Sequence, residues 1–300
     1  MIKKIYHVLN SEGISGLYLR LAIRSAKLFP RRISGYKKFT NLFSGKGIEF
    51  GGASESFRSQ GYFPVYETAS SLDNCNFSSE TPWEKNLTTS KSFYFHPNKE
   101  PGMQFCTEAS DLYMIENEQY DFVASCHMLE HSANPIKVLY EWQRILKDNG
   151  TLLLLLPHKE ATFDKSREIT SLEHMINDFE CDMDETDQTA IDEAIELYNK
   201  DYDIGIDNTL YSSFFNEDLM RDNFKNRLVH HHVFNLHSAV KMVDYVNFEI
   251  LHIENIIGRT SFGIHNSIVI LCKKNLSLPD DANTNFIKNS IELDNFEFNI

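Results

Sequence analysis

The chain has 300 residues, of which 42% are hydrophobic and 24% are charged. This length and balance fit one large α/β domain with additions, or two domains. The net charge of −14 argues against a surface that binds a phosphate backbone, so we expect no nucleic-acid partner. The five cysteines form no CxxC pair, and the longest apolar run, 152–156, has the length of a strand. These features predict reduced thiols, a cytoplasmic protein and no membrane-spanning helix.

The positive charge is concentrated at the amino terminus. Residues 1–46 hold ten Lys/Arg and one acid, a net +9, which leaves −23 for the remainder because the total is −14. Residues 14–29 have the pattern of an amphipathic helix, which Pro30 ends. Such a segment fits peripheral contact of residues 1–40 with a membrane surface or another anionic partner. A solvated basic helix lying on an acidic body is the alternative.

Strand and helix signals alternate through the first half of the chain. Residues 46–50 predict a strand that leads into Gly51-Gly52, and Ser54 is placed to cap the helix that follows. Pro135 suits the first turn of a helix that runs to Leu146. Polar residues 74–101 predict an irregular excursion, and a short helix is expected before 121–125. The later strands are predicted at residues 65–69, 103–106, 121–125 and 151–156.

This alternation predicts an α/β fold with a doubly wound, mostly parallel sheet. After it, residues 158–235 are acidic, polar and rich in His, which predicts a helical cap. Residues 248–257 and 264–272 predict a closing hairpin, which suits one antiparallel strand at the end of the sheet. We therefore divide the chain into a basic helical segment (1–44), a core (45–157 with 236–274), a cap or acceptor-binding insertion (158–235) and a flexible tail (275–300).

A glycine turn and an acid suggest a nucleoside site. Gly51 and Gly52, at the carboxyl end of the first strand, allow a ligand to approach the backbone, and the next helix start favours an anion. About twenty residues on, Asp73 has the spacing of an acid that binds both ribose hydroxyls, with Glu67 as competitor and a solvated loop Asp as the alternative. Neither GxGxxG nor Tyr-x-x-x-Lys is present, which disfavours dehydrogenases and epimerases.

Several further segments carry a family resemblance. They are 108–112, 120–123 and 127–131, taken together with 49–52 and 144–150. In this order and spacing they resemble class I S-adenosylmethionine (SAM)-dependent methyltransferases, over residues 46–156 and, more loosely, over the closing helix and hairpin. The resemblance implies SAM as cofactor and a Rossmann-like, seven-stranded sheet whose last strand is antiparallel.

The resemblance also implies cofactor contacts. It places Glu49, Gly51 and Gly52 around the methionine part of SAM, and Asp73 on the ribose. It places Glu108 and Ala109 at the adenine edge. The floor beneath the sulfonium would be Ser125, Cys126 and His127. The first motif departs from the family pattern, because it has two adjacent glycines where many members have three spaced ones.

One motif suggests a metal. The sequence His127-x-x-Glu130-His131 has the form of an inverted zinc-protease motif. That interpretation requires a long helix and a further ligand, whereas this motif directly follows a predicted strand. The family resemblance accounts for Leu129-Glu130-His131 without an ion, so we expect no metal there. A Mg²⁺ site made by Asp164, Asp178 and a histidine of the cap is the alternative, although these residues have no recognised metal spacing.

The acceptor side is expected to supply a base. An aliphatic hydroxyl is a poor nucleophile, and a histidine near the carboxyl ends of the strands suits removal of its proton. His158 has this position best, and His131 is next. The expected substrate contacts are Asp164, Arg167, which would grip a phosphate or carboxylate, His174, and His231 and His232, which the sequence does not separate. For each residue a structural hydrogen bond is the alternative.

Segment 157–164 is similar to methyltransferases found with bacterial surface-polysaccharide biosynthesis. We therefore predict O-methylation of a small, carbohydrate-like or phosphorylated acceptor. Two alternatives remain open: methyl transfer to nitrogen or to a phosphoryl-linked oxygen, and a non-catalytic SAM-binding scaffold that docks through its basic amino terminus. The acceptor's identity, the methylated atom and the oligomeric state are not predicted.

Overall fold

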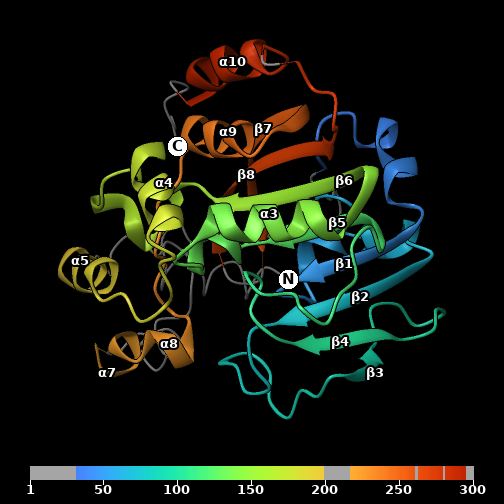
Figure 1. Cartoon of the computed structure of the whole chain (residues 1–300), viewed down its shortest axis with the longest axis horizontal. Coiled ribbons are helices and arrows are strands. Elements are labelled where there is room, and N and C mark those ends of the chain that lie inside the picture. The colour runs from blue at the N-terminus through green and yellow to red at the C-terminus, as the bar shows by residue number, and fades with distance from the viewer. Residues whose placement is uncertain (1–31, 199–216, 261–262, 280, 295–300) are drawn as a thin grey trace, which may run out of the picture.

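The computed structural model describes residues 32–198, 217–260, 263–279 and 281–294 (Figure 1). The amphipathic helix expected at 14–29, and most of the basic amino-terminal segment, lie outside these ranges. Within them, no helix is long and apolar enough to cross a bilayer.

One eight-stranded sheet runs through the molecule in the order β3-β4-β2-β1-β5-β6-β8-β7 (Figure 1). The pairings of β1, β2, β4, β5 and β6 with one another are parallel, whereas β3 and β8 run against their neighbours. The strands are β1 (Lys46–Phe50), β2 (Ser71–Asn76), β3 (Ser90–Phe93), β4 (Gly102–Cys106), β5 (Tyr120–Cys126), β6 (Leu146–Pro157), β7 (Phe248–Thr260) and β8 (Gly263–Lys274). The predicted Rossmann-like sheet with a closing antiparallel strand is confirmed, and β3 adds an eighth strand within the excursion expected to be irregular.

The leucine run of β6 shows why this sheet is buried on both faces. Successive side chains of a strand point to opposite faces. Accordingly, Leu152, Leu154 and Leu156 join one apolar cluster, whereas Leu153 and Leu155 join the other. All five are fully buried, as expected for a central strand that has helices or turns on either side.

Helices α3 (Pro135–Ile145) and α9 (Leu236–Tyr245) cover one face of the sheet (Figure 1). The Asn134 side chain accepts a hydrogen bond from the Lys137 backbone N–H, which caps the start of α3. Trp142 of α3 packs against Phe50 of β1, with ring centroids 5.0 Å apart. The second face is covered by short elements near the amino terminus: η1 (Tyr36–Lys38), η2 (Thr40–Phe43), η3 (Glu55–Phe57) and α2 (Val65–Thr68).

The predicted second strand was wrong. Residues expected as a strand at 65–69 form α2, in which the Ala69 N–H bonds to the Val65 carbonyl. The apolar pair Val65 and Tyr66 is buried in a single helical turn, which is too short for periodicity to separate from a strand. The true strand, β2, begins at Ser71 and has polar residues in its interior. The helix expected between the third and fourth strands is also absent, since residues 107–119 form turns.

A group of helices lies beyond the carboxyl ends of the parallel strands, at the left of Figure 1. It corresponds to the described part of the predicted cap, whose limits stay a prediction. Its elements are η5 (Lys159–Ala161), η6 (Phe163–Ser166), α4 (Leu172–Glu180), α5 (Thr189–Leu197), α7 (Glu217–Arg221), α8 (Asn223–Asn226) and η4 (Leu129–His131), the last of which connects the cap to β5.

The tail predicted to be flexible contains a docked helix, α10 (Thr284–Asp294), on top of α9 (Figure 1). Phe286 and Ile287 pack against the core. Asp294 accepts hydrogen bonds from the Leu236 N–H (3.0 Å) and the His237 N–H (2.8 Å) at the start of α9. The prediction failed because this end of the chain is rich in Asn and acids, and the contacts that hold it are made with residues distant in the sequence.

Replacing Asp294 by Ala tests this docking. We expect Asp294→Ala to lower the free energy of unfolding by about 1–2 kcal/mol, because two helix-start N–H groups lose their acceptor. Urea unfolding of the full chain measures the change. Glu292→Ala, at an exposed position of the same helix, should stay within about 0.5 kcal/mol of the parent. Equal stability of the two variants would contradict a structural role for Asp294.

Candidate functional site

The carboxyl ends of β1, β2, β4 and β5 meet at one edge of the sheet. Phe50 lies opposite Cys75 of β2 and Ser125 of β5, and Asn76 lies opposite Cys106 of β4. The strand order runs outward in both directions from β1 and β5. Open α/β sheets bind ligands at such a reversal point, outside the carboxyl ends of the strands.

The turn after β1 requires both of its glycines. Gly51 has a φ of +77°, in the region that favours glycine, and its N–H bonds to the Cys75 carbonyl at 3.0 Å. A Cβ on Gly52 would lie 2.4 Å from the Glu49 carboxyl group. The Gly52 N–H instead donates to Oδ1 of Asn74 at 3.0 Å. Because these two positions carry no side chain, a ligand can approach the backbone at this edge of the sheet.

Glu49 is a neutral carboxylic acid at pH 7. Burial raises its pKa to about 8, against the opposing effects of hydrogen bonds from Tyr66 and Ser54. The Tyr66 hydroxyl donates to Oε2 at 2.7 Å, and the Ser54 N–H donates to Oε1 at 2.9 Å. The carboxyl group thus holds the glycine turn to α2. Its predicted place beside the methionine part of SAM stays a prediction.

The placement of Asp73 on the ribose was wrong. Asp73 lies inside β2, opposite Ile48, three residues before the strand ends. Its carboxylate accepts hydrogen bonds from the Met103 N–H (2.8 Å) and the Tyr120 hydroxyl (2.8 Å), so it connects β2 to β4 and β5. The error follows from placing the second strand six residues too early. Glu67, the competitor, lies in α2.

Asn76 ends β2, at the position where the sequence predicted an acid. Its side-chain Nδ2 is buried and has no hydrogen-bond partner among the described residues. A buried amide without a partner is uncommon and calls for a ligand or a water. The sequence offered no signal for Asn76, because the boundaries of its strand were misplaced.

Glu108 lies just beyond β4 and is bound by the cap. Arg227 donates to Oε1 of Glu108 at 2.6 Å and forms an ion pair with Glu185 at 2.9 Å. The Arg227 guanidinium also lies over the Phe77 ring, 4.9 Å from its centroid. Burial raises the pKa of Glu108 to about 7, although Arg227 acts to lower it. Ala109, its predicted companion, packs against the apolar core.

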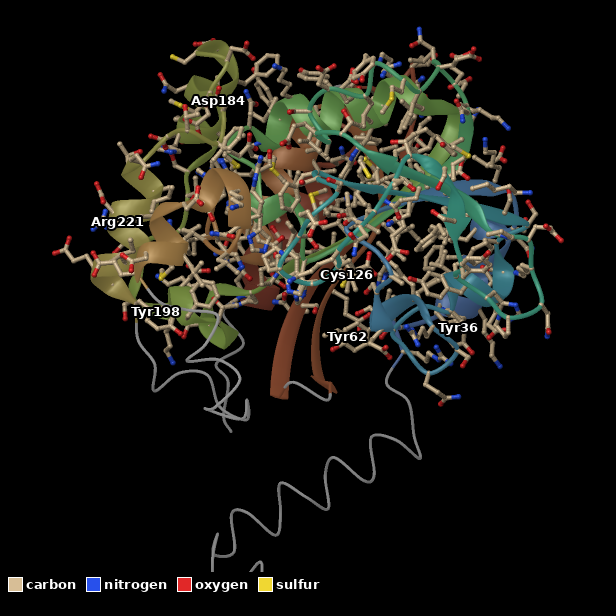
Figure 2. All side chains as sticks on the ribbon, turned by 90° about the horizontal axis from the view of Figure 1, so that it is seen from below. Tyr36, Tyr62, Cys126, Asp184, Tyr198 and Arg221 are labelled. Atoms are coloured by element: carbon tan, nitrogen blue, oxygen red, sulfur yellow. The ribbon has the colours of Figure 1, made fainter. Side chains whose placement is uncertain are left out.

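The residues predicted to lie beneath the sulfonium of SAM are at the end of β5. Ser125 is fully buried, and its hydroxyl has no partner in the described part of the chain. Cys126 contacts Ser56, with Sγ and Oγ 3.3 Å apart. His127 has a φ of +51°, and its Nε2 lies 3.0 Å from Oγ of Ser267. Figure 2 shows Cys126 near the middle of the molecule, between the cap residue Arg221 and the amino-terminal Tyr36.

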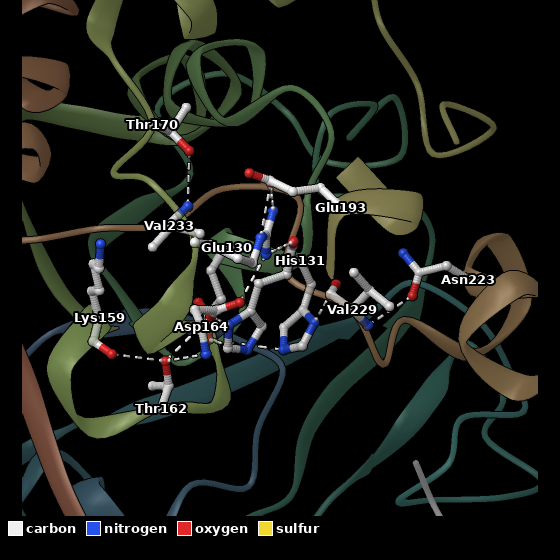
Figure 3. Close-up of polar contacts among 12 residues, drawn as sticks. Glu130, His131, Lys159, Thr162, Asp164, Thr170, Glu193, Asn223, Val229 and Val233 are labelled. Carbon is white, nitrogen blue, oxygen red and sulfur yellow. Dashed lines mark hydrogen bonds and ion pairs between the residues drawn. The ribbon is translucent and has the colours of Figure 1, made fainter. Parts of the chain in front are cut away.

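A cluster of acids and histidines follows directly, where η4 meets the cap (Figure 3). Nδ1 of His131 lies 3.2 Å from the Val229 carbonyl oxygen, so this nitrogen carries the proton and donates it. Nδ1 of His230 lies 2.5 Å from Oδ2 of Asp164. The Nε2 atoms of both histidines face Oε1 of Glu130, at 3.8 Å from His131 and 3.9 Å from His230. We name these four residues, Glu130, His131, Asp164 and His230, the polar cluster.

Burial sets the electrostatics of the polar cluster. It raises the pKa of Glu130 to about 7, and it lowers the pKa of His131 well below the usual value, with His230 adding to that effect. Burial also acts to lower the pKa of His230, but the Asp164 and Glu130 carboxylates outweigh it and the net shift is upward. The pKa of Asp164 falls, because His230 and Arg167 outweigh burial.

Arg167 does not present a free guanidinium to an acceptor. It is 2% exposed, and it donates to Asp164 (2.8 Å), Glu193 (3.0 Å) and the His230 carbonyl (2.8 Å). The prediction that it grips a phosphate is therefore wrong. Its donors are already used to hold Asp164 in place, an arrangement that sequence alone could not distinguish from an open binding site.

His158 is also occupied by structural contacts. Its Nδ1 accepts a hydrogen bond from the Glu160 N–H at 3.2 Å, and its Nε2 lies 3.4 Å from Asp294 of α10. Neither ring nitrogen is directed to an acceptor, so the structure does not support His158 as the base. The sequence could not reveal this, because α10 was expected to be a flexible tail.

The remaining predicted acceptor residues lie deeper in the cap. His232 is buried, and its Nε2 lies 3.3 Å from the Ala133 carbonyl, whereas His231 contacts Asn223 at 3.2 Å. Burial lowers the pKa of His231 to about 4 and that of His232 to about 3. His174, on α4, is exposed and lies 3.4 Å from Asp178. His231 and His232 are therefore neutral hydrogen-bonding groups. The contact of all three histidines with substrate stays a prediction.

Residues 78–154 match the family model described as a methyltransferase domain. The segment runs from the loop after β2 to the middle of β6, and it contains Glu108, the floor at the end of β5, and Glu130 with His131. SAM, the cofactor that the sequence predicts, is the methyl donor of this domain.

Solved structures with a similar fold include two SAM-dependent methyltransferases. The one from Methanosarcina mazei is 14% identical with a TM-score of 0.44, over 77% of this chain and 93% of that chain. The one from Mesorhizobium loti is 10% identical with a TM-score of 0.46, over 80% of this chain and 96% of that chain. No curated protein sequence matches the chain.

Glu49 gives the stability of the fold a specific pH dependence. Its folded-state pKa of about 8 exceeds the ordinary value of 4.5. The folded state therefore holds this proton more tightly, and the stability it contributes is complete below pH 4.5 and is lost as the pH rises through 8. At about 1.4 kcal/mol per pKa unit, the loss is on the order of 5 kcal/mol.

Glu49→Gln mimics the protonated acid and should remove this loss. Urea unfolding at pH 5, 6.5 and 8 should show the parent falling progressively below Glu49→Gln. Glu55→Gln, on the exposed side of the same turn, should run parallel to the parent. A constant difference between parent and Glu49→Gln at all three pH values would mean that Glu49 is ionised throughout.

Proposed function

We propose that this protein transfers a methyl group from SAM to a hydroxyl oxygen of a small, carbohydrate-like or phosphorylated acceptor. The observation that carries the proposal is the methyltransferase-domain match, which falls on the segment that brings Glu108, Cys126 and Glu130 to the carboxyl edge of the sheet. The glycine turn after β1 opens at that same edge. A role in surface-glycan biosynthesis follows from the resemblance of segment 157–164 and is part of the proposal.

The cofactor is placed along this edge. The backbone of Gly51 and Gly52 would contact the methionine part of SAM, and Ser125, Cys126 and His127 would lie beneath the sulfonium. We assign the ribose contact to Asn76 in place of Asp73, because the buried Nδ2 of Asn76 lacks a partner among the described residues. Glu108 and Ala109 remain at the adenine edge, with Arg227 bound to Glu108 from the cap.

The acceptor is placed against the polar cluster. In the reaction, the acceptor oxygen forms a bond to the methyl carbon as the carbon–sulfur bond breaks, and sulfur keeps the electron pair. The hydroxyl proton must also leave, so polar groups are needed beside the oxygen. As the base that takes the hydroxyl proton, His131 fits better than His158. Its Nε2 carries no proton, and it lies one turn beyond β5.

Calorimetry on two variants separates the two candidates for the ribose. Removing one hydrogen bond costs on the order of 1 kcal/mol, so Asn76→Ala should bind SAM about fivefold more weakly than the parent. Asp73→Asn should keep the parental SAM affinity while losing stability, because Asp73 joins β2 to Met103 and Tyr120. The reverse pattern, with only Asp73→Asn weakened, would restore the assignment made from the sequence.

A product search tests the activity itself. The full chain would be incubated with SAM and with sugar nucleotides or glycan precursors, and mass spectrometry would look for products heavier by one methylene together with demethylated SAM. We expect an O-methylated product. Methylation confined to amines would contradict O-methylation and indicate an N-methyltransferase. SAM binding with no turnover across the panel would contradict catalysis and favour a scaffold.

A further inference from the structure

We propose that Glu130, His131 and His230 form a binding site for a divalent transition-metal ion, with zinc as the first choice. The three residues each offer one ligand atom, and these atoms all lie within 4.8 Å of one another. Two histidines and one carboxylate are a donor set that binds zinc and similar ions while leaving coordination positions open.

The spacing of the ligand atoms suits such an ion. Zinc binds imidazole nitrogen and carboxylate oxygen at about 2.0–2.2 Å, which puts neighbouring tetrahedral ligands roughly 3.4 Å apart. Here Oε1 of Glu130 lies 3.8 Å from Nε2 of His131 and 3.9 Å from Nε2 of His230. Each histidine nitrogen would move about half an ångström closer to Oε1 of Glu130, and the three ligand atoms already lie within 4.8 Å of one another.

Glu130 supplies an independent observation. Its side chain is fully buried, and neither carboxylate oxygen has a hydrogen-bond partner among the residues that the structure describes. A buried carboxyl group without a hydrogen bond is costly, because it loses its hydration. The charge of His230, 3.9 Å away, offsets part of this loss. A cation between Glu130 and the two Nε2 atoms would supply the missing partner.

The outer contacts orient both histidines as metal ligands require. A ligating histidine normally donates its other N–H to a carbonyl or carboxylate, which fixes the tautomer and the ring. His131 does so through Nδ1 to the Val229 carbonyl, and His230 does so through Nδ1 to Asp164. Asp164 is in turn held by Arg167 at 2.8 Å (Figure 3). The Nε2 atoms of both rings are therefore turned toward Glu130.

This site differs from the inverted zinc-protease motif considered in the sequence. His127 belongs to that motif but turns to Ser267, 3.0 Å away. The third ligand comes instead from His230, in the cap. A second group, His174, Asp178 and His232, also meets the spacing for a metal, but Nε2 of His232 is already engaged with the Ala133 carbonyl.

The ion would also explain how the acceptor is activated, a step that rests on the proposed function. An acceptor hydroxyl bound to an open position of the ion would have a lowered pKa and would release its proton to solvent water. The oxygen would then bond to the methyl carbon of SAM as the carbon–sulfur bond breaks toward sulfur. His131 would thus act as a ligand, and no separate histidine base would be needed.

Metal titration of the full chain tests the site without cofactor or acceptor. Protein stripped with a chelator would be titrated with Zn²⁺ by calorimetry and with Co²⁺ by visible absorbance. We expect one ion per chain, and a raised unfolding temperature with Zn²⁺. Glu130→Gln, His131→Ala and His230→Ala should lose this binding, whereas Asp164→Asn, outside the ligand set, should weaken it about 10–100-fold.

His127→Asn is the matched control. It lies in the same sequence motif, and Asn tolerates the positive φ of this position, so it should bind Zn²⁺ like the parent. Near-parental circular dichroism of Glu130→Gln would show that a lost site is not a lost fold. Failure of the parent to bind either ion at micromolar concentration would overturn the proposal and leave a hydrogen-bonded histidinium between Asp164 and Glu130. SAM binding is measured separately, so the two proposals fail independently.

Discussion

The parallel pairing of β1 with both β2 and β5 is the interaction on which the site depends. It places Phe50 opposite Cys75 on one side and Ser125 on the other. The glycine turn, the end of β2 and the loop after β5 consequently emerge at the same edge. The hydrogen bonds that Asp73 accepts from Met103 and Tyr120 help to fix this register, because a shift of β2 by one residue would turn its carboxylate away from both donors.

Buried ion pairs of two cap arginines also fix the positions of the site residues. Arg167 is almost completely buried and joins Asp164 to the His230 carbonyl, and Arg227 joins Glu108 to Glu185. Such pairs contribute little net stability, since desolvation offsets their attraction, but removing one partner leaves an uncompensated charge. Their effect here is positional. They fix the polar cluster and the edge of β4 relative to the cap.

The fold was largely predictable because most of its strands and helices have local signals in the sequence. The apolar run at 151–156, Pro135 at the start of α3 and the closing hairpin each carry a local signal that the structure confirms. The second strand was misplaced because β2 has polar interior residues, such as Asp73 and Asn74, that are satisfied only by distant partners. The helix α10 was missed for the same reason, since its contacts to α9 are not visible locally.

The candidate site was less predictable, because its residues are paired across long sequence separations. Glu130 and His131 are read from the sequence, but their link to His230 and Arg167 depends on how the cap folds back. The central claim is that the carboxyl edge of the sheet binds SAM, and hydrogen–deuterium exchange tests it most directly. Demethylated SAM should slow exchange in 49–57, 76–77, 107–109 and 126–128. Saturation with no protection there, or protection elsewhere, would contradict the account.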